Sequence, residues 1–421
     1  MFKTLKNAWQ IPDLRKKLIF TVLILLAYRL GSAIPVPFID TDAMSKYFDT
    51  ALSSTILGLY NAMSGSAFSQ ASLLALGIQP YINSSIIIQL LTIAIPALER
   101  LSKEGGEEGK KKLNQITRYA TIGLGLLMGW AYYMMLVNQN STYGLLTEEG
   151  ILPAITIILA FTAGSTVVMW LGEQITEHGI GNGISLILFA NILAGLTQFI
   201  GQVSSLVWWI AVIMAVGFIA LVLLIIFVND AERRIPVQYA KRVVGRKVYG
   251  GQSTDLPIKV SMTGVMPVIF AQSIASLPAT IYAFFGLKQG PVYQYVWSSN
   301  SWVYAIMYFL LIFFFSWFYA AIQYDPVDIS NHMKKNGGFI PGFRPGKPTA
   351  DFIKKVINKI VVFGAVYLGI VALLPIIAGN ILGGSLAIGG TSVIIVVSVA
   401  LETAKALEAQ MLMRHYKGFL D

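Results

Sequence analysis

The sequence predicts an all-α integral membrane protein with ten membrane-spanning helices, and its composition and hydropathy carry that prediction. Of its 421 residues, 55% are hydrophobic and only 12% are charged, about half the charged fraction of an ordinary soluble domain. Apolar runs of about 17–23 residues recur along the chain, and one helix of that length crosses the hydrocarbon of a bilayer. We expect spans at 18–34, 73–98, 119–137, 151–171, 183–200, 206–228, 265–285, 302–322, 360–378 and 393–413.

Positive charge falls almost entirely on one side of this topology. If the chain crosses the membrane ten times, all 31 Lys and Arg residues except Arg29, Lys46 and Lys288 lie in segments on the same side of that membrane. Cytoplasmic loops carry the excess of such residues in membrane proteins, so both termini are predicted to be cytoplasmic. The apolar run that begins at residue 18 continues past Arg29 and nine more spans follow, so we expect a retained first span instead of a cleaved signal peptide.

The net charge of +10 lies mainly on long cytoplasmic loops, at 99–118, 229–260 and 323–356. Because these loops join spans, their charge favours anionic lipid headgroups and acidic partners over DNA. The loop at 172–182 is also cytoplasmic in this topology yet has no Lys or Arg. Orientation depends on the summed bias, so this loop does not change the prediction.

Residues 51–72 form an unusual segment between the first and second spans. The segment is mildly apolar but contains Gly58, Asn61, Gly65 and several serines, so it is too polar to face lipid as a stable span. Irregular backbone at membrane depth is tolerated only where protein or a water-filled cavity surrounds it. An external loop with a surface helix fits the composition as well, and both alternatives stay open.

The second span is also interrupted by residues that disfavour a plain apolar helix. Gly77 and Pro80 lie near its start, and Asn83 and Gln89 add amides within it. Such residues can simply mark close helix packing, but their spacing favours contact with water or with a partner helix. Gln272 gives the seventh span a related character. We expect two five-span halves, 1–204 and 205–421, with these broken spans near their interface.

The residues needed for chemistry within the membrane are missing. The middles of the first nine spans hold no Asp, Glu, Lys or His, the groups that proton-coupled transporters and intramembrane proteases require. In the tenth span, Glu402 and Lys405 lie in the cytoplasmic half at a spacing of three residues, where we expect a local ion pair. The chain has no Cys, and His178, His332 and His415 are too far apart in sequence for a metal-ligand motif. The glycine-rich run 179–183 lacks a P-loop lysine. We predict no enzyme, metal or cofactor, and expect Arg29 to snorkel or to pair with a backbone carbonyl.

Six short motifs, in order along the chain, point to a known family. They are LGIQPYI at 76–82 with SSIIIQLL at 84–91, WLGEQIT at 170–176, QYAKR at 238–242, GQST at 251–254, FIPGFRPG at 339–346 and GGTS at 389–392. In this register the whole chain resembles the SecY family of bacterial protein-conducting channels. Asp255 and Ser261 depart from the family, where many members carry His and Asn.

The resemblance implies an hourglass pore between two inverted-repeat halves, closed by a ring of apolar side chains. It also implies that residues 51–72, the predicted plug, block the external funnel. The second, third, seventh and eighth spans would form a lateral gate, with Asn83, Gln89 and Gln272 as polar contacts that hold it closed. The predicted pore ring consists of Ile78, Ile82, Ile184, Leu188, Ile269 and Ile395.

The same resemblance assigns partners to the cytoplasmic loops 229–260 and 323–356. They would dock the SecA motor or a translating ribosome, through Arg344 and through Arg233, Arg234, Lys241, Arg242, Arg246 and Lys247. SecE would clamp the halves and SecG would lie at the periphery, in the bacterial inner membrane. The clients would be preproteins with signal sequences. A secondary transporter for a small solute and an accessory translocase or insertase paralogue are the alternatives.

Overall fold

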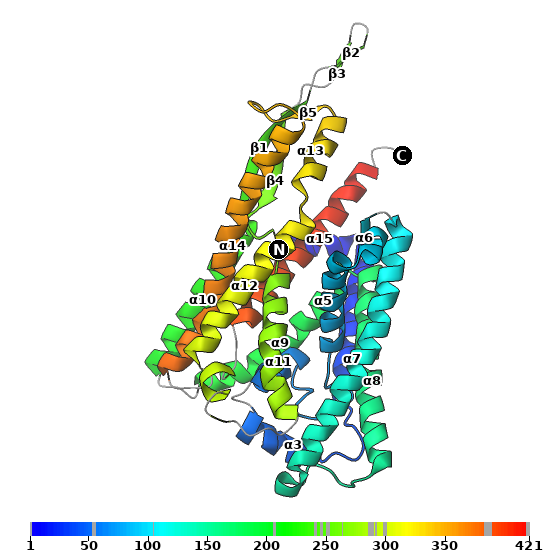
Figure 1. The fold of residues 1–421 in the computed structure, drawn as a ribbon, viewed down its shortest axis with the longest axis vertical. Helices are drawn as coiled ribbons and strands as arrows, with labels where there is room; N and C mark the ends of the chain where they lie inside the picture. Colours follow the sequence, from blue (N-terminus) through cyan, green and yellow to red (C-terminus); the bar gives the residue numbers. More distant parts are fainter. Residues whose placement is uncertain are drawn as a thin grey trace. The chain divides into compact units, whose positions relative to one another are not determined.

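The computed structural model describes residues 2–52, 56–103, 105–204, 208–239, 242–244, 247–249, 253–262, 264–284, 290, 293–297, 301–382 and 390–417. The predicted all-α architecture is confirmed, and each of the ten predicted spans falls on a helix (Figure 1). These helices are α2 (Pro12–Gly31), α5 (Gln79–Ala94), α7 (Gly106–Tyr143), α8 (Ile151–His178), α9 (Gly183–Ser204), α10 (Trp208–Asp230), α11 (Met266–Phe284), α12 (Trp302–Gln323), α14 (Lys347–Leu382) and α15 (Gly390–Lys417).

Shorter elements lie between them. The α-helices are α1 (Phe2–Gln10), α3 (Thr41–Tyr47), α4 (Ile56–Ser64), α6 (Pro96–Lys103) and α13 (Pro326–Lys335). Single π-helical turns cover Phe48–Leu52 (η1) and Tyr293–Trp297 (η2), and the strands are β1 (Glu232–Tyr239), β2 (Arg242–Val244), β3 (Lys247–Tyr249), β4 (Ser253–Lys259) and β5 (Gly338–Phe339).

By length and hydropathy alone, five helical stretches of the described chain could cross a membrane, or six if α5 and α6 form one bent span. The chain turns by 106° between α5 and α6, so the second span ends before Leu98, where the sequence predicts its end. Pro96 explains the break, because proline disfavours helical backbone in the residue before it. Ile95 accordingly has extended angles, φ −110° and ψ 112°.

Contacts divide the chain into two compact units. Unit 1 contains Met1–Met214, Ser276–Tyr304 and Pro375–Asp421, and unit 2 contains Ala215–Ala275 and Ala305–Leu374. The predicted halves 1–204 and 205–421 are a different division of the chain and stay a prediction.

In unit 1, helices α7 and α8 run side by side along most of their length (Figure 1). Glycines allow this close approach, because a Cβ on Gly129 would lie 3.1 Å from the Ile158 carbonyl oxygen. An aromatic core forms against α7, where the Tyr132 ring lies 4.8 Å from Phe68 and 4.6 Å from Phe161, measured between centroids. Phe68 belongs to the predicted plug, so that segment is part of the core of unit 1.

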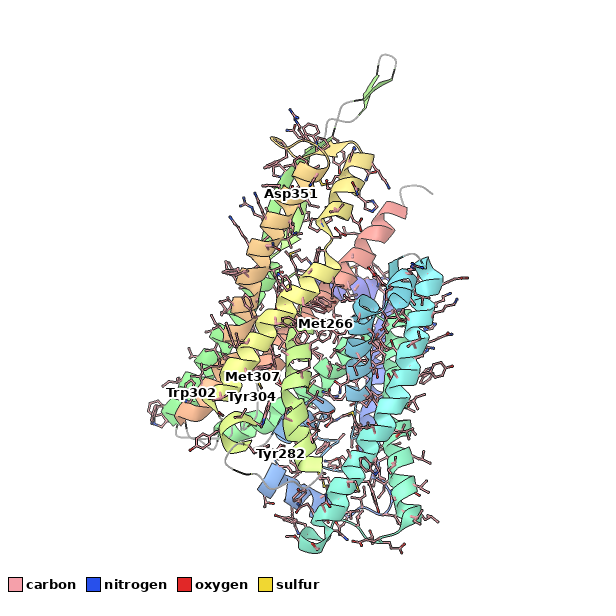
Figure 2. The ribbon with its side chains drawn as sticks, in the orientation of Figure 1. Met266, Tyr282, Trp302, Tyr304, Met307 and Asp351 are labelled. Carbon is pink, nitrogen blue, oxygen red and sulfur yellow. The ribbon has the colours of Figure 1, made fainter. Side chains whose placement is uncertain are left out.

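Unit 2 carries a small antiparallel sheet, in the order β4-β1-β5. Ile235 and Val237 of β1 point to a buried core shared with Ile353 and Ile357 of α14. Asp351, which Figure 2 labels, lies in the first turns of α14, near this sheet. The sequence analysis placed only loops here, and strands form because alternate residues of β1 face a helix and water.

Candidate functional site

The predicted plug has the fold of a short buried helix followed by a run of tight turns. Its helix α4 packs against α9, and Leu57, Phe68 and Ala71 are almost fully buried. The composition left open whether this segment is surrounded by protein or is a surface loop. The burial of its described residues favours the first alternative, because a surface helix would expose one whole face.

Asn191 of α9 joins the predicted plug to α2. Its side-chain Nδ2 donates one hydrogen bond of 2.8 Å to the hydroxyl of Tyr28 and another of 2.8 Å to the backbone carbonyl of Met63. Asn191 and Tyr28 are each 1% exposed. A buried amide is stable only when hydrogen-bonded, so this side chain holds α2, α9 and the end of α4 in one arrangement.

Arg29 makes a second contact with the same end of α4. Its Nη1 donates a hydrogen bond of 2.8 Å to the carbonyl of Gly65. Of the two alternatives that the sequence left open, snorkelling and pairing with a backbone carbonyl, this contact is the second. Gly65 has φ +65°, and Ser66 has φ +70°. Left-handed backbone is unfavourable for a residue with a Cβ, so the turn that follows α4 depends on surrounding contacts to keep its shape.

Two further side chains hold the segment. The Tyr132 hydroxyl on α7 donates a hydrogen bond of 2.8 Å to the carbonyl of Phe68. On α5, the amide of Gln79 contacts the sulfur of Met63 at 3.1 Å. Within the segment, Asn61 accepts a hydrogen bond from the backbone N–H of Ser69, which folds the turn back onto α4.

The predicted pore-ring residues lie near the starts of their helices and are mostly buried. Ile78 is the N-cap residue of α5, and Ile184 and Leu188 lie in the first two turns of α9. Unit 1 holds every member except Ile269, which lies in the part of α11 that belongs to unit 2. Exposed fractions are 2% for Ile78, Leu188 and Ile395, 6% for Ile82 and 7% for Ile269, and Ile184 is half-buried.

The predicted gate residues are divided between the two units. Asn83 and Gln89 are half-buried on α5 in unit 1. Gln272 is buried on α11, in the portion that belongs to unit 2. Their role at a lateral gate stays a prediction.

Two loops that the sequence predicts to dock partners share one folded body in unit 2. Strand β1, from loop 229–260, pairs with β5, from loop 323–356, through Gln238 with Phe339 and Tyr239 with Gly338. Charged side chains stay outside this body: Arg233, Arg234 and Arg344 are exposed. A hydrogen bond to Glu232 raises the pKa of Arg234 above its ordinary value.

Arg344 is exposed on a turn that is well fixed. The hydroxyl of Thr349 donates to the carbonyl of Arg344 at 2.8 Å, and the hydroxyl of Ser330 donates to the carbonyl of Gly346 at 2.9 Å. The rings of Phe343 and Phe352 lie 4.3 Å apart. These contacts hold the backbone of the turn, and the side chain of Arg344 is exposed.

The remaining predicted docking residues belong to the segment between β1 and β4. Arg242 and Lys247 lie on the hairpin strands β2 and β3, which Figure 1 draws beyond the sheet. Lys241 and Arg246 lie outside the described residues. Among the residues that the structure does describe, no three His, Asp or Glu side chains gather as metal ligands would.

The sequence analysis missed the residues that hold the predicted plug, apart from Arg29. Tyr28, Asn191 and Tyr132 lie inside apolar spans, where an amide or hydroxyl must find a partner. Asn191 was detectable by that criterion, since its neighbours from Phe189 to Leu193 are apolar or small. Which partner each of them would reach is a matter of tertiary structure.

Comparison with known proteins agrees with this geometry. The sequence profile of the SecY family matches residues 72–404. Over the full length of both chains, the sequence is 44% identical to the protein translocase subunit SecY of Streptomyces galbus and 42% identical to that of Streptomyces scabiei.

Solved structures share the fold at lower sequence identity. A protein-conducting channel superposes with a TM-score of 0.66 at 21% identity, covering 94% of this chain and 92% of its own. A SecY channel in which the plug domain stabilises the closed state gives 0.64 at 20%, with the same coverage. Canine Sec61 in a ribosome–channel complex gives 0.62 at 20%, again covering 94% and 92%.

The fold and the matching family profile together define a polytopic membrane protein of the protein-conducting channel class. Full-length identity above 40% to curated translocase subunits then places it more narrowly. The chain belongs to the SecY family, and it is a channel subunit and not an enzyme.

Proposed function

We propose that this chain conducts unfolded preproteins across the bacterial inner membrane and releases apolar segments sideways into lipid. The observation that carries the proposal is the buried helix α4, which lies against α9 and is tied to it through the side chain of Asn191. Helix α9 also carries Ile184 and Leu188, two of the predicted ring residues. A short buried helix held beside an apolar constriction is what a closed channel with a displaceable plug requires.

The aliphatic chemistry of the ring suits a pore that must not bind its cargo. A constriction lined by apolar side chains excludes water and ions by dewetting, without any binding group. Branched aliphatic side chains can shift rotamer around a passing chain and make no sequence-specific hydrogen bond. The six residues Ile78, Ile82, Ile184, Leu188, Ile269 and Ile395 would supply this barrier.

Lateral release would use helices α5, α7, α11 and α12. An apolar segment that leaves water for lipid gains about 25 cal/mol per Å² of buried apolar surface. Amides at the gate oppose such opening, because separating them leaves polar groups facing hydrocarbon. Asn83, Gln89 and Gln272 are our candidates for this role.

The sheet-bearing body of unit 2 would be the docking surface for a cytoplasmic partner. Its exposed cations can attract acidic protein surfaces and ribosomal RNA at long range. The related Sec61 channel is found in a complex with a ribosome. We therefore propose the SecA motor and the translating ribosome as partners, with SecE and SecG as companion subunits, anionic lipids around the spans and both termini in the cytoplasm.

Reconstitution tests this function directly. Vesicles that contain this chain, a SecE-like subunit, SecA and ATP should take up a signal-bearing preprotein into a protease-protected space. Vesicles without the chain, or without ATP, are the controls. Uptake that is equal with and without the chain would contradict the proposal.

A further inference from the structure

We infer that Tyr28, Arg29 and Asn191 form a polar latch that holds the predicted plug in its resting position and must release before a polypeptide passes. This inference rests on the proposed function and deepens it, because it assigns positioning residues that are not part of the pore ring, the gate or the docking surface. All three side chains lie outside the plug, on α2 and α9.

The latch acts on the end of a helix, where backbone groups need partners. The last four carbonyls of any α-helix have no partner within that helix. Met63 is one residue from the end of α4, and its carbonyl accepts from Asn191 at 2.8 Å. One residue past the end, the carbonyl of Gly65 accepts from Arg29 at 2.8 Å. A cation at this end also complements the negative pole of the helix dipole.

Every acceptor in the plug that the latch uses is a backbone carbonyl. The latch therefore depends on the shape of the turn that follows α4 and not on plug side chains. That turn has two consecutive residues in left-handed backbone, Gly65 and Ser66, a conformation that the surrounding contacts must maintain. When the latch opens, Met63 and Gly65 lose partners together, so release is cooperative.

The position of Asn191 couples the latch to the predicted ring. Leu188 and Asn191 are three residues apart on α9, and residues at this spacing lie on one face of a helix. A displacement of α9 that moves Leu188 outward for a passing chain would also carry Asn191 away from Met63. The latch thus links widening of the constriction to release of the plug.

The absence of cysteine from the natural chain permits a direct test of plug release. Ser64→Cys places a thiol in the last residue of α4, where the native side chain is 3% exposed. Its rate of labelling by a water-soluble maleimide, in the full chain with its SecE-like partner, reports how often the plug opens. We expect Tyr28→Phe to raise this rate about fivefold and Asn191→Leu about 30-fold, as expected for one and two lost hydrogen bonds.

Three further measurements separate a latch from general damage. Thr166→Val, which removes one hydrogen bond internal to α8, should leave the labelling rate unchanged. Adding Tyr28→Phe to Asn191→Leu should raise it no further, because the two residues share one bond. In both latch variants, a preprotein that has already entered the channel should move at the wild-type rate. The ion leak through resting channels, measured in vesicles that contain the variant, should rise.

Unchanged labelling and leak in Tyr28→Phe and Asn191→Leu would overturn the latch, even if the wild-type chain transports preproteins. Failure of wild-type transport would instead overturn the proposed function, whatever the labelling rates. If Asn191→Leu does not fold, Tyr28→Phe decides the question alone, because it removes a single oxygen atom.

Discussion

The predicted plug region of unit 1 and the sheet-bearing body of unit 2 use their polar groups in opposite ways. Around the plug, the side chains of Arg29, Tyr132 and Asn191 each donate to a defined backbone carbonyl, and Tyr132 and Asn191 are buried. On the sheet-bearing body, an apolar core is buried and the cations face outward. Individual hydrogen bonds therefore fix the plug region in place. On the sheet-bearing body, the polar groups instead contribute a combined positive charge at the surface.

This difference predicts different responses to substitution. A buried donor that loses its acceptor retains the full cost of desolvation, so one atom can matter in the plug region. An exposed charge is screened by salt and contributes little to folding, so single charges on the sheet-bearing body should affect partner binding and leave stability unchanged. Four substitutions test the comparison, from the largest expected effect on stability to the smallest.

Gly164→Ala should destabilise the chain most. A Cβ at this position of α8 would lie 1.9 Å from the backbone oxygen of Leu73, and backbone cannot move aside as a flexible side chain can. We expect a loss of about 3 kcal/mol in unfolding free energy, measured by thermal unfolding in detergent. Gly123→Ala is the control, because nothing lies within 4 Å of a Cβ there; equal effects of the two substitutions would refute the packing argument.

Gly65→Ala should be the next most severe. Gly65 and Gly144 have the same φ of +65°, but a Cβ on Gly65 would lie 2.8 Å from Nη1 of Arg29 and 3.0 Å from Oδ1 of Asn191, whereas Gly144 has open space. Gly144→Ala should therefore cost about 1 kcal/mol for backbone strain alone, and Gly65→Ala about 2 kcal/mol or more. Unfolding curves of the two variants measure this difference. Equal losses would mean that the side chains around Gly65 can move aside to accommodate a Cβ.

Tyr132→Phe isolates one buried hydrogen bond. The substitution leaves the aromatic contacts with Phe68 and Phe161 in place but deprives the Phe68 carbonyl of its donor. We expect a loss of about 1 kcal/mol, again by thermal unfolding. Tyr133→Phe changes the half-buried neighbour on the same helix and should be close to neutral. If the two tyrosines behave alike, the hydroxyl of Tyr132 contributes nothing specific.

Arg344→Glu should leave the unfolding curve unchanged, because its exposed guanidinium takes no part in the contacts that fix its turn. Binding of SecA or of ribosomes should weaken about tenfold at low salt, and the difference from wild type should shrink as salt rises. Lys347→Glu, an exposed change at the start of α14, reports the effect of charge reversal at a neighbouring position of the same loop. Equal losses in both variants would indicate that only net charge matters and that the position of Arg344 does not.

Several features of the fold followed from the sequence because they depend on local chemistry. Apolar runs of span length located the ten helices, and the polarity of residues 51–72 marked the segment as unfit for lipid. The pairing of Arg29 with a backbone carbonyl was one of two alternatives that the sequence left open, since a guanidinium within a span must find an acceptor or reach the membrane surface. The sheet could not be predicted in this way, because β1 and β5 lie far apart in sequence. Only the pairing of these two strands shows that the two loops form one folded body.

The sequence by itself determined that this chain is a helical membrane protein, since hydropathy is a sum over local segments. Only the tertiary structure decided that Asn191 reaches Tyr28 and Met63, and that a Cβ on Gly164 would meet Leu73. A hydrogen bond or a close backbone approach depends on positions within about 3 Å. Distant segments acquire such positions only when the whole chain packs.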